Sequence, residues 1–271
     1  MSGLSVLFAA VALLDLPQKE QPTLAAGSEI RFSFPDLPKP YEAMAAGRDV
    51  QTYCTVSLPD DYTKTGKFPL LVFLDGGRGG YGANIASPRA FAGKSVWIVA
   101  NFPLFRKELE PRDAWNGLRV SYDDYAVISN SYRAMMDRIR AEIPNLAPEK
   151  SVIGGNSNGG HTLAILLSML DETVVSSFSG YFFIDGGFDW NSFNRTQKLK
   201  EKHILYLVAG VPESDPYRKY LFAWTDMMKH FAKEHGMANW RFEVMDGVPH
   251  GLHPAHHPVL KDWIERVGKA T

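Results

Sequence analysis

The stretch SVIGGNSNGGH, residues 151–161, decides the fold class of this chain. It contains the pattern Gly-x-Ser-x-Gly, which runs from Gly155 to Gly159 and has Ser157 at its centre. The pattern alone says little, because chains of this glycine content match it by chance. Here, however, a β-branched run precedes it and an apolar helical pattern, residues 163–170, follows it. The stretch therefore predicts a tight turn between a strand and a helix, with Ser157 at the turn.

Such a turn makes a serine hydroxyl available for chemistry. It projects the hydroxyl above the edge of a sheet, and glycines on either side leave room for a strained backbone. The helix that follows brings unpaired N–H groups and a positive dipole end to the place where an oxyanion would form. The alternatives are a turn without chemistry and a phosphate-binding loop, but no Gly-Lys-Ser/Thr follows. We therefore predict that Ser157 is a nucleophile.

A second glycine-rich stretch lies in FLDGGRGG, residues 73–80, where DGGRGG directly follows the apolar run LLVFL, residues 70–74. Glycines in such a loop allow backbone N–H groups to approach a substrate without a Cβ in the way. We predict an oxyanion hole formed by the N–H groups of Gly77 and Asn158. The alternative is a glycine-rich turn that serves only the geometry of the chain.

Four of the eight histidines lie in DGVPHGLHPAHH, residues 246–257. A serine nucleophile needs a neutral imidazole as its base. Where the serine lies on a strand-to-helix turn of this kind, the usual order along the chain is serine, acid, histidine. His250 follows a strand-like run, residues 240–245, so we predict that it is the base, with His253 as the alternative. Clustered histidines can also bind zinc, but no glutamate lies beside them and prolines interrupt any ligand-bearing helix.

The sequence offers three candidates for the carboxylate that should orient the imidazole. The loop AGVPESDP, residues 209–216, follows the apolar run at residues 204–208 and carries Glu213 and Asp215. The spacing of Glu213 from Gly210 places its carboxylate one short turn past the strand, which favours Glu213. Asp215 remains an alternative in the same loop, and Asp185 is the next candidate.

The rest of the chain alternates between strand and helix patterns, which predicts an α/β fold with a mostly parallel sheet, helices on both faces and a single domain. We expect a catalytic domain at residues 28–271, with a small lid at 181–202. Strands are predicted at 30–34, 50–58, 70–74, 96–100, 151–153, 174–178, 204–208 and 240–245, and helices at 122–143, 161–170, 217–235 and 258–267.

Composition limits the function further. The chain has 271 residues and a net charge of −1, with no basic stripe, so we expect no nucleic-acid partner. Its one cysteine, Cys54, lies in a β-branched run and is predicted to be a packed strand residue. Residues 1–27 form a separate N-terminal segment, in which the apolar run 4–14 is too short to span a membrane. Either it is a signal-peptide core, and the protein is secreted or periplasmic, or it is a packed helix of a cytoplasmic protein.

Four motifs together resemble the esterase branch of the α/β-hydrolase superfamily that includes feruloyl, acetyl-xylan and enterochelin esterases. They are VSLPDDY at 56–62, FPLLVFLDGG at 68–77, GNSNGG at 155–160 and GVPH at 247–250, and the resemblance covers residues 48–265. It implies an α/β-hydrolase sheet, no cofactor, and ester substrates that are often attached to sugars. In two respects the chain departs from this pattern: Asp75 stands where histidine is usual, and the acid is Glu if Glu213 fills that role.

These observations predict a serine hydrolase that cleaves a carboxylic ester, on a small molecule or a sugar, through an acyl-enzyme intermediate. The same residues would also suit a serine peptidase or an acyltransferase, and a catalytically silent binding module is the alternative outside enzymes. We expect Trp115 and Trp190, with Phe193, to line the substrate pocket, although packing would explain these aromatic residues equally well.

Overall fold

The sheet is the framework of the molecule. The computed structural model describes residues 24–109, 119–187, 199–210 and 216–269. Within them, eight strands form one sheet in the order β1-β2-β4-β3-β5-β6-β7-β8. The first two strands run antiparallel to their neighbours, and the strands from β4 to β8 are parallel to one another. The strands are β1 (Glu29–Phe34), β2 (Thr52–Ser57), β3 (Leu70–Leu74), β4 (Ile98–Phe102), β5 (Val152–Asn156), β6 (Gly180–Ile184), β7 (His203–Gly210) and β8 (Trp240–Asp246).

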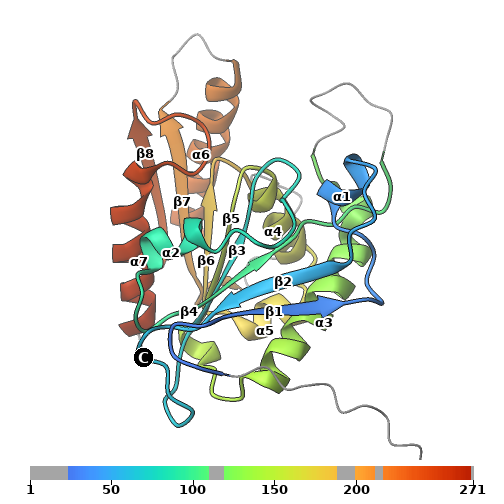
Figure 1. Ribbon diagram of the computed structural model, residues 1–271. Coiled ribbons are helices and arrows are strands. Elements are labelled where there is room, and N and C mark those ends of the chain that lie inside the picture. Colours follow the sequence, from blue (N-terminus) through green and yellow to red (C-terminus); the bar gives the residue numbers. More distant parts are fainter. Residues whose placement is uncertain (1–23, 110–118, 188–198, 211–215, 270–271) are drawn as a thin grey trace, which may run out of the picture.

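Helices cover both faces of this sheet (Figure 1). The two that pack together on one face are α2 (Ala86–Ala92) and α7 (His257–Lys269). The opposite face carries α3 (Tyr125–Glu142), α4 (Asn158–Ser168), α5 (Glu172–Ser177) and α6 (Pro216–Glu234). The short α1 (Tyr41–Ala45) begins beside the segment after β4, where the N–H of Tyr41 donates to the carbonyl oxygen of Leu104. A mostly parallel sheet with helices on both faces is the arrangement that defines an α/β fold, so the predicted fold class is confirmed.

Side chains alternate between two cores along the central strands. On β3, Leu71 and Phe73 pack with Phe91 of α2 and Trp263 of α7. Their neighbours Leu70, Val72 and Leu74 point to the other face and join the core beneath α3 and α4. Each fully buried side chain of this size contributes about 1.5–3 kcal/mol to folding. Burial on both faces explains why these strands appear in the sequence as continuous apolar runs.

One predicted strand is wrong. Residues 174–178 were expected to form a strand, but they belong to α5 and the turn after it. Asp171 caps this helix by accepting a hydrogen bond of 3.0 Å from the backbone N–H of Val174. The strand is instead β6, so residues 181–184 of the predicted lid lie in the centre of the sheet, while residues 188–198 of that lid lie outside the described residues. A local N-cap and burial on the sheet outweighed the β-branched composition of Val174 and Val175.

Other expectations can be compared directly with the structure. Cys54 is fully buried on β2, as predicted, and burial raises the pKa of its thiol. The apolar run 4–14 lies outside the described residues. None of the helices in the described part of the chain is both long enough and apolar enough to cross a membrane. The parallel strands end at one edge of the sheet, where this class of fold binds its ligands.

Candidate active site

The turn at Ser157 joins β5 to α4, as the sequence predicts. Ser157 has φ 49° and ψ −112°, a strained backbone conformation for a residue with a side chain. Its N–H donates a hydrogen bond of 2.7 Å to the carbonyl oxygen of Ile184, at the end of the neighbouring strand β6. This bond anchors the strained turn to the sheet, so the hydroxyl stays at the carboxyl edge.

Glycines around Ser157 are required by close backbone contacts. A Cβ on Gly159 would overlap the carbonyl oxygen of Leu74, and a Cβ on Gly155 would overlap the backbone of Gly159. A third glycine, Gly186, lies against the carbonyl oxygen of Ser157 so closely that any Cβ would overlap it. The glycines thus bring the ends of β3, β5 and β6 together around the serine.

His250 lies in the loop after β8, 93 residues from Ser157 in the sequence. Its Nε2 is 3.1 Å from the Oγ of Ser157, within hydrogen-bonding distance. The imidazole is 38% exposed, so one side remains open to an incoming molecule. The structure therefore brings together the serine and the histidine that the sequence singled out.

On the far side of the imidazole lies Asp185. Its Oδ2 is 3.5 Å from the Nδ1 of His250 and accepts a hydrogen bond of 2.8 Å from the backbone N–H of Gly251. Its Oδ1 accepts from the backbone N–H of Ala209. The side chain is fully buried, and this burial raises the pKa of Asp185, while the two N–H donors and His250 act in the opposite direction.

Asp185 comes from a different strand end from the two carboxylates that the sequence favoured. Glu213 and Asp215 follow β7 and lie outside the described residues, whereas Asp185 follows β6. A signal for Asp185 was present in the sequence: the apolar run 180–184 ends in an aspartate and two glycines, as the run 70–74 does. Asp185 ranks behind Glu213 and Asp215 in the sequence because residues 174–178, and not 180–184, have the β-branched pattern of a strand.

The glycine loop after β3 lies beside the start of α4. Gly77 has φ 59°, and the N–H of Gly79 donates a hydrogen bond of 2.9 Å to the carbonyl oxygen of Gly76, which closes the turn. No acceptor for the N–H of Gly77 occurs among the described residues. Asn158 is buried at the N-terminus of α4 and contacts this loop. The two predicted oxyanion donors thus lie on adjoining segments.

Asp75, at the start of this loop, holds two amide side chains. Its Oδ1 accepts a hydrogen bond of 2.9 Å from Nδ2 of Asn84, and its Oδ2 accepts one of 2.9 Å from Nδ2 of Asn101. Burial raises the pKa of Asp75, and the two amides partly offset that effect. Asp75 therefore braces the base of the glycine loop from the side of β4.

The remaining histidines of the cluster contact one another at the start of α7. The backbone N–H of His253 donates to Nδ1 of His256 at 2.9 Å, and Nδ1 of His253 accepts from the N–H of Ala255. Burial lowers the pKa of His256 to about 4. Among the described residues no group of three or more His, Cys, Asp or Glu side chains could hold a metal ion.

The pocket residues predicted from the sequence, Trp115, Trp190 and Phe193, lie outside the described residues. A groove of about 640 Å³ is found elsewhere, lined by residues such as Pro69, Trp97 and Lys150. These residues precede β3, β4 and β5, so the groove lies at the amino ends of the strands, opposite Ser157. The groove is therefore separate from the site around the serine.

The chain is similar to known proteins in three-dimensional structure but not in sequence. No protein-family model matches the chain, and no curated protein matches its sequence. Among solved structures, the feruloyl esterase module from Clostridium thermocellum, complexed with sinapinate, matches with a TM-score of 0.56 at 12% identity. The alignment covers 88% of this chain and 87% of that one.

Two further structures agree. A CE1 ferulic acid esterase from Anaeromyces mucronatus, in complex with ferulic acid, has a TM-score of 0.57 at 12% identity and covers 94% of this chain and 97% of its own. A thermostable esterase has a TM-score of 0.57 at 17% identity, with 89% of this chain and 62% of that chain aligned. At these identities the likeness establishes the fold and leaves activity open. The resemblance indicated by the motifs is confirmed at that level, and the chain has the α/β-hydrolase fold that it shares with these esterases.

Proposed function

We propose that this protein is a serine hydrolase that cleaves a carboxylic ester, with Ser157 as nucleophile, His250 as base and Asp185 as the acid that orients the base. One observation carries the proposal. The Oγ of Ser157, the two ring nitrogens of His250 and the carboxylate of Asp185 form a continuous chain with separations of 3.1 and 3.5 Å. Such contacts are often loose before substrate binds and tighten in the complex.

In the first half of the reaction, the Oγ of Ser157 attacks the acyl carbon of the ester while Nε2 of His250 accepts the hydroxyl proton. The carbonyl oxygen becomes an oxyanion, which accepts hydrogen bonds from the N–H groups of Gly77 and Asn158. The intermediate then breaks the bond to the alcohol oxygen. His250 returns its proton to that oxygen, so the alcohol leaves and an acyl-serine remains.

In the second half, water attacks the acyl-serine and His250 again accepts a proton. Collapse of the second tetrahedral intermediate releases the carboxylic acid, and the proton on His250 returns to the Oγ of Ser157. Asp185 has the same task in both halves, which is to hold Nδ1 of the imidazole and to stabilise its protonated form. The backbone N–H donors of Gly251 and Ala209 keep the carboxylate in place.

The substrate class is part of the proposal. Two of the structural neighbours are named as feruloyl or ferulic acid esterases, which supports an aromatic acyl group or an acylated sugar as the substrate. The open side of His250 leaves room for such a group. Because the same machinery can cleave amides, a peptidase remains a distinct outcome of the test.

A fluorophosphonate probe tests the mechanism, because it reacts with an activated serine and leaves ordinary serines unmodified. We expect mass spectrometry to locate one adduct on Ser157, and Ser157→Ala to remove it. A substrate panel follows, with p-nitrophenyl acetate, methyl ferulate, an acetylated sugar and a peptide p-nitroanilide. Turnover of the esters supports the proposal. Labelling of Ser157 with cleavage of the anilide alone would favour a peptidase. If the protein is not labelled and cleaves none of these substrates, the proposal of a serine hydrolase is refuted.

A further inference from the structure

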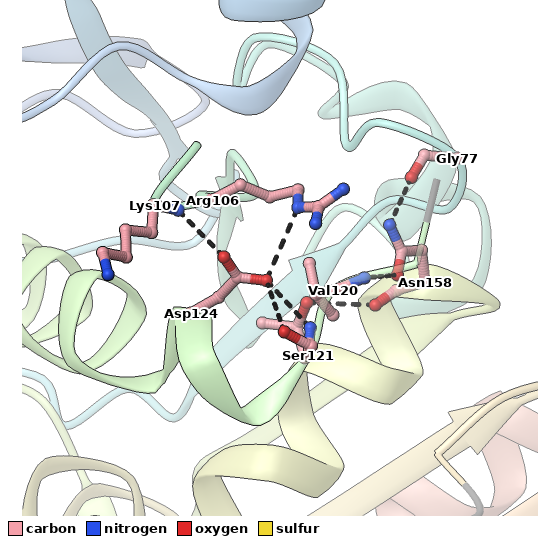
Figure 2. A network of polar contacts seen from close by, with 8 residues as sticks. Gly77, Arg106, Lys107, Val120, Ser121, Asp124 and Asn158 are labelled. Atoms are coloured by element: carbon pink, nitrogen blue, oxygen red, sulfur yellow. Dashed lines mark hydrogen bonds and ion pairs between the residues drawn. The ribbon is translucent and has the colours of Figure 1, made fainter. Parts of the chain in front are cut away.

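The side chain of Asn158 joins three separate segments next to the serine (Figure 2). Its Nδ2 donates a hydrogen bond of 2.7 Å to the carbonyl oxygen of Gly77, in the glycine loop after β3. Its Oδ1 accepts a hydrogen bond of 2.9 Å from the backbone N–H of Val120. Asn158 itself lies in the first turn of α4, directly after Ser157, and is 3% exposed.

These partners determine which way the amide is turned. The Gly77 carbonyl can only accept a hydrogen bond and the Val120 N–H can only donate one, so the nitrogen must face Gly77 and the oxygen Val120. Among side chains of this length and charge, only asparagine offers a donor and an acceptor on one rigid group. An apolar side chain of similar size would leave both backbone groups without these partners.

The hydrogen bond from Asn158 to the carbonyl of Gly77 affects the position of the N–H group of Gly77. In a trans peptide the C=O and the N–H point in opposite directions. The Gly76 carbonyl is held by the N–H of Gly79, so the N–H of Gly77 points out of the turn. The Gly77 carbonyl is held by Asn158, which fixes the next peptide plane. Without that second bond, only the turn's own hydrogen bond would hold this glycine at φ 59°, and the loop that carries its N–H could shift relative to α4.

The hydrogen bond to Val120 connects Asn158 to a buried group of polar contacts around Asp124. The residue after it, Ser121, donates its backbone N–H to Oδ2 of Asp124 at 2.8 Å. The same carboxylate accepts from the N–H of Lys107 at 2.9 Å and lies 3.5 Å from Nε of Arg106. Both Arg106 and Asp124 are 3% exposed, and Figure 2 shows them adjoining the Asn158 contacts. Asn158 therefore connects this buried group of polar contacts to the glycine loop after β3.

We propose that the side chain of Asn158 is a positioning group that sets the spacing of the oxyanion hole. Its backbone N–H is one proposed donor, and its amide holds the loop that carries the other, Gly77. One residue thereby fixes both donors relative to each other and to Ser157. This inference rests on the proposed function, because it concerns the oxyanion formed during ester cleavage.

The expected consequence is selective for the transition state. Removing an oxyanion donor lowers kcat by about 10²- to 10³-fold, and a donor displaced by about 1 Å has a comparable or smaller effect. Asn158→Ala keeps the backbone donor and releases the loop. We therefore expect kcat for p-nitrophenyl acetate to fall about 10- to 100-fold, with KM changed less than about threefold. Asn158→Asp should be at least as impaired, because its carboxylate would repel the Gly77 carbonyl.

A trifluoromethyl ketone separates positioning from a general structural effect. It forms an anionic adduct with the serine, so its affinity should fall by about the same factor as kcat/KM, while inhibition by acetate, the product, should stay unchanged. Ser168→Ala is the matched control. Ser168 lies in the same helix, is equally buried and bonds to Tyr122 near Val120, but it does not contact the glycine loop. It should keep wild-type kcat.

The outcomes distinguish this inference from the proposed function. Wild-type turnover together with an equally active, correctly folded Asn158→Ala variant would overturn the inference alone. A loss that is shared equally by Ser168→Ala, or one that appears in KM and product inhibition, would also overturn it, because that pattern is one of general damage. A wild-type protein that neither hydrolyses esters nor reacts with the ketone would overturn the proposed function and this inference with it.

Discussion

Asp185→Asn removes the negative charge beside His250 while keeping the size of the side chain. The carboxylate of Asp185 accepts N–H groups on both oxygens, from Gly251 and from Ala209, and is fully buried. An asparagine has one acceptor oxygen and one NH₂ group, so in either orientation an NH₂ must face a backbone N–H. Hence the variant should lose stability as well as the charge that orients the imidazole.

The two effects have different sizes. A buried donor without its acceptor costs about 1–3 kcal/mol, which corresponds to a fall of about 2–12 °C in Tm for a chain of this size. The loss in turnover should be larger, since a triad acid replaced by its amide lowers kcat by up to about 10⁴-fold through the wrong imidazole tautomer. We expect a loss of about 10²- to 10⁴-fold in kcat at a temperature where the variant is fully folded.

The assay is turnover of p-nitrophenyl acetate at 20 °C, with the melting curve followed by circular dichroism. Asp171→Asn is the matched control. It alters a carboxylate that is 3% exposed and that also accepts a backbone N–H, at the start of α5. It should lose similar stability and keep its turnover. Glu213→Gln and Asp215→Asn complete the set, and kcat should fall less than about tenfold in each. The assignment is refuted if Asp185→Asn stays active while one of these two is crippled.

Variants of His250, His161 and Gly186 test other parts of the site. His250→Ala should lose as much turnover as Ser157→Ala, the double variant should be scarcely slower, and His253→Ala should stay active; a dead His253→Ala beside an active His250→Ala would exchange their roles. His161 has its pKa lowered by burial to about 3, so its contribution to stability is complete above about pH 6.5 and is lost as the pH falls toward 3. Between pH 7.5 and pH 4.5, the free energy of unfolding in urea should therefore fall by about 2–3 kcal/mol less in His161→Asn than in the wild type. An equal fall in the two proteins would contradict this. Gly186→Ala forces a Cβ onto the Ser157 carbonyl, so it should cost more than about 2 kcal/mol and most of the turnover, and wild-type kcat and Tm would show that the turn can yield.

Sequence patterns accounted for most of the elements. Every parallel strand except β6 was predicted within a few residues, because strands buried on both faces are continuous apolar runs. The error at residues 174–178 shows the limit of this reasoning. Two adjacent apolar runs competed for one strand position, and the N-cap at Asp171, together with packing against the sheet, decided between them. Local composition carries no information about that competition.

The sequence by itself determined the turn at Ser157, the glycine loop at Gly77 and the position of His250 at the end of a strand. Each of these depends on a local pattern, a glycine pair or a strand end, that short stretches of chain specify. Which carboxylate meets His250 was decided only by the tertiary structure. The sheet order sets β6 between β5 and β7, and this brings Asp185 under the loop that follows β8. The bridging role of Asn158 was likewise beyond the sequence, because its partners lie 81 and 38 residues away, and only the folded sheet brings such distant backbone groups within hydrogen-bonding distance.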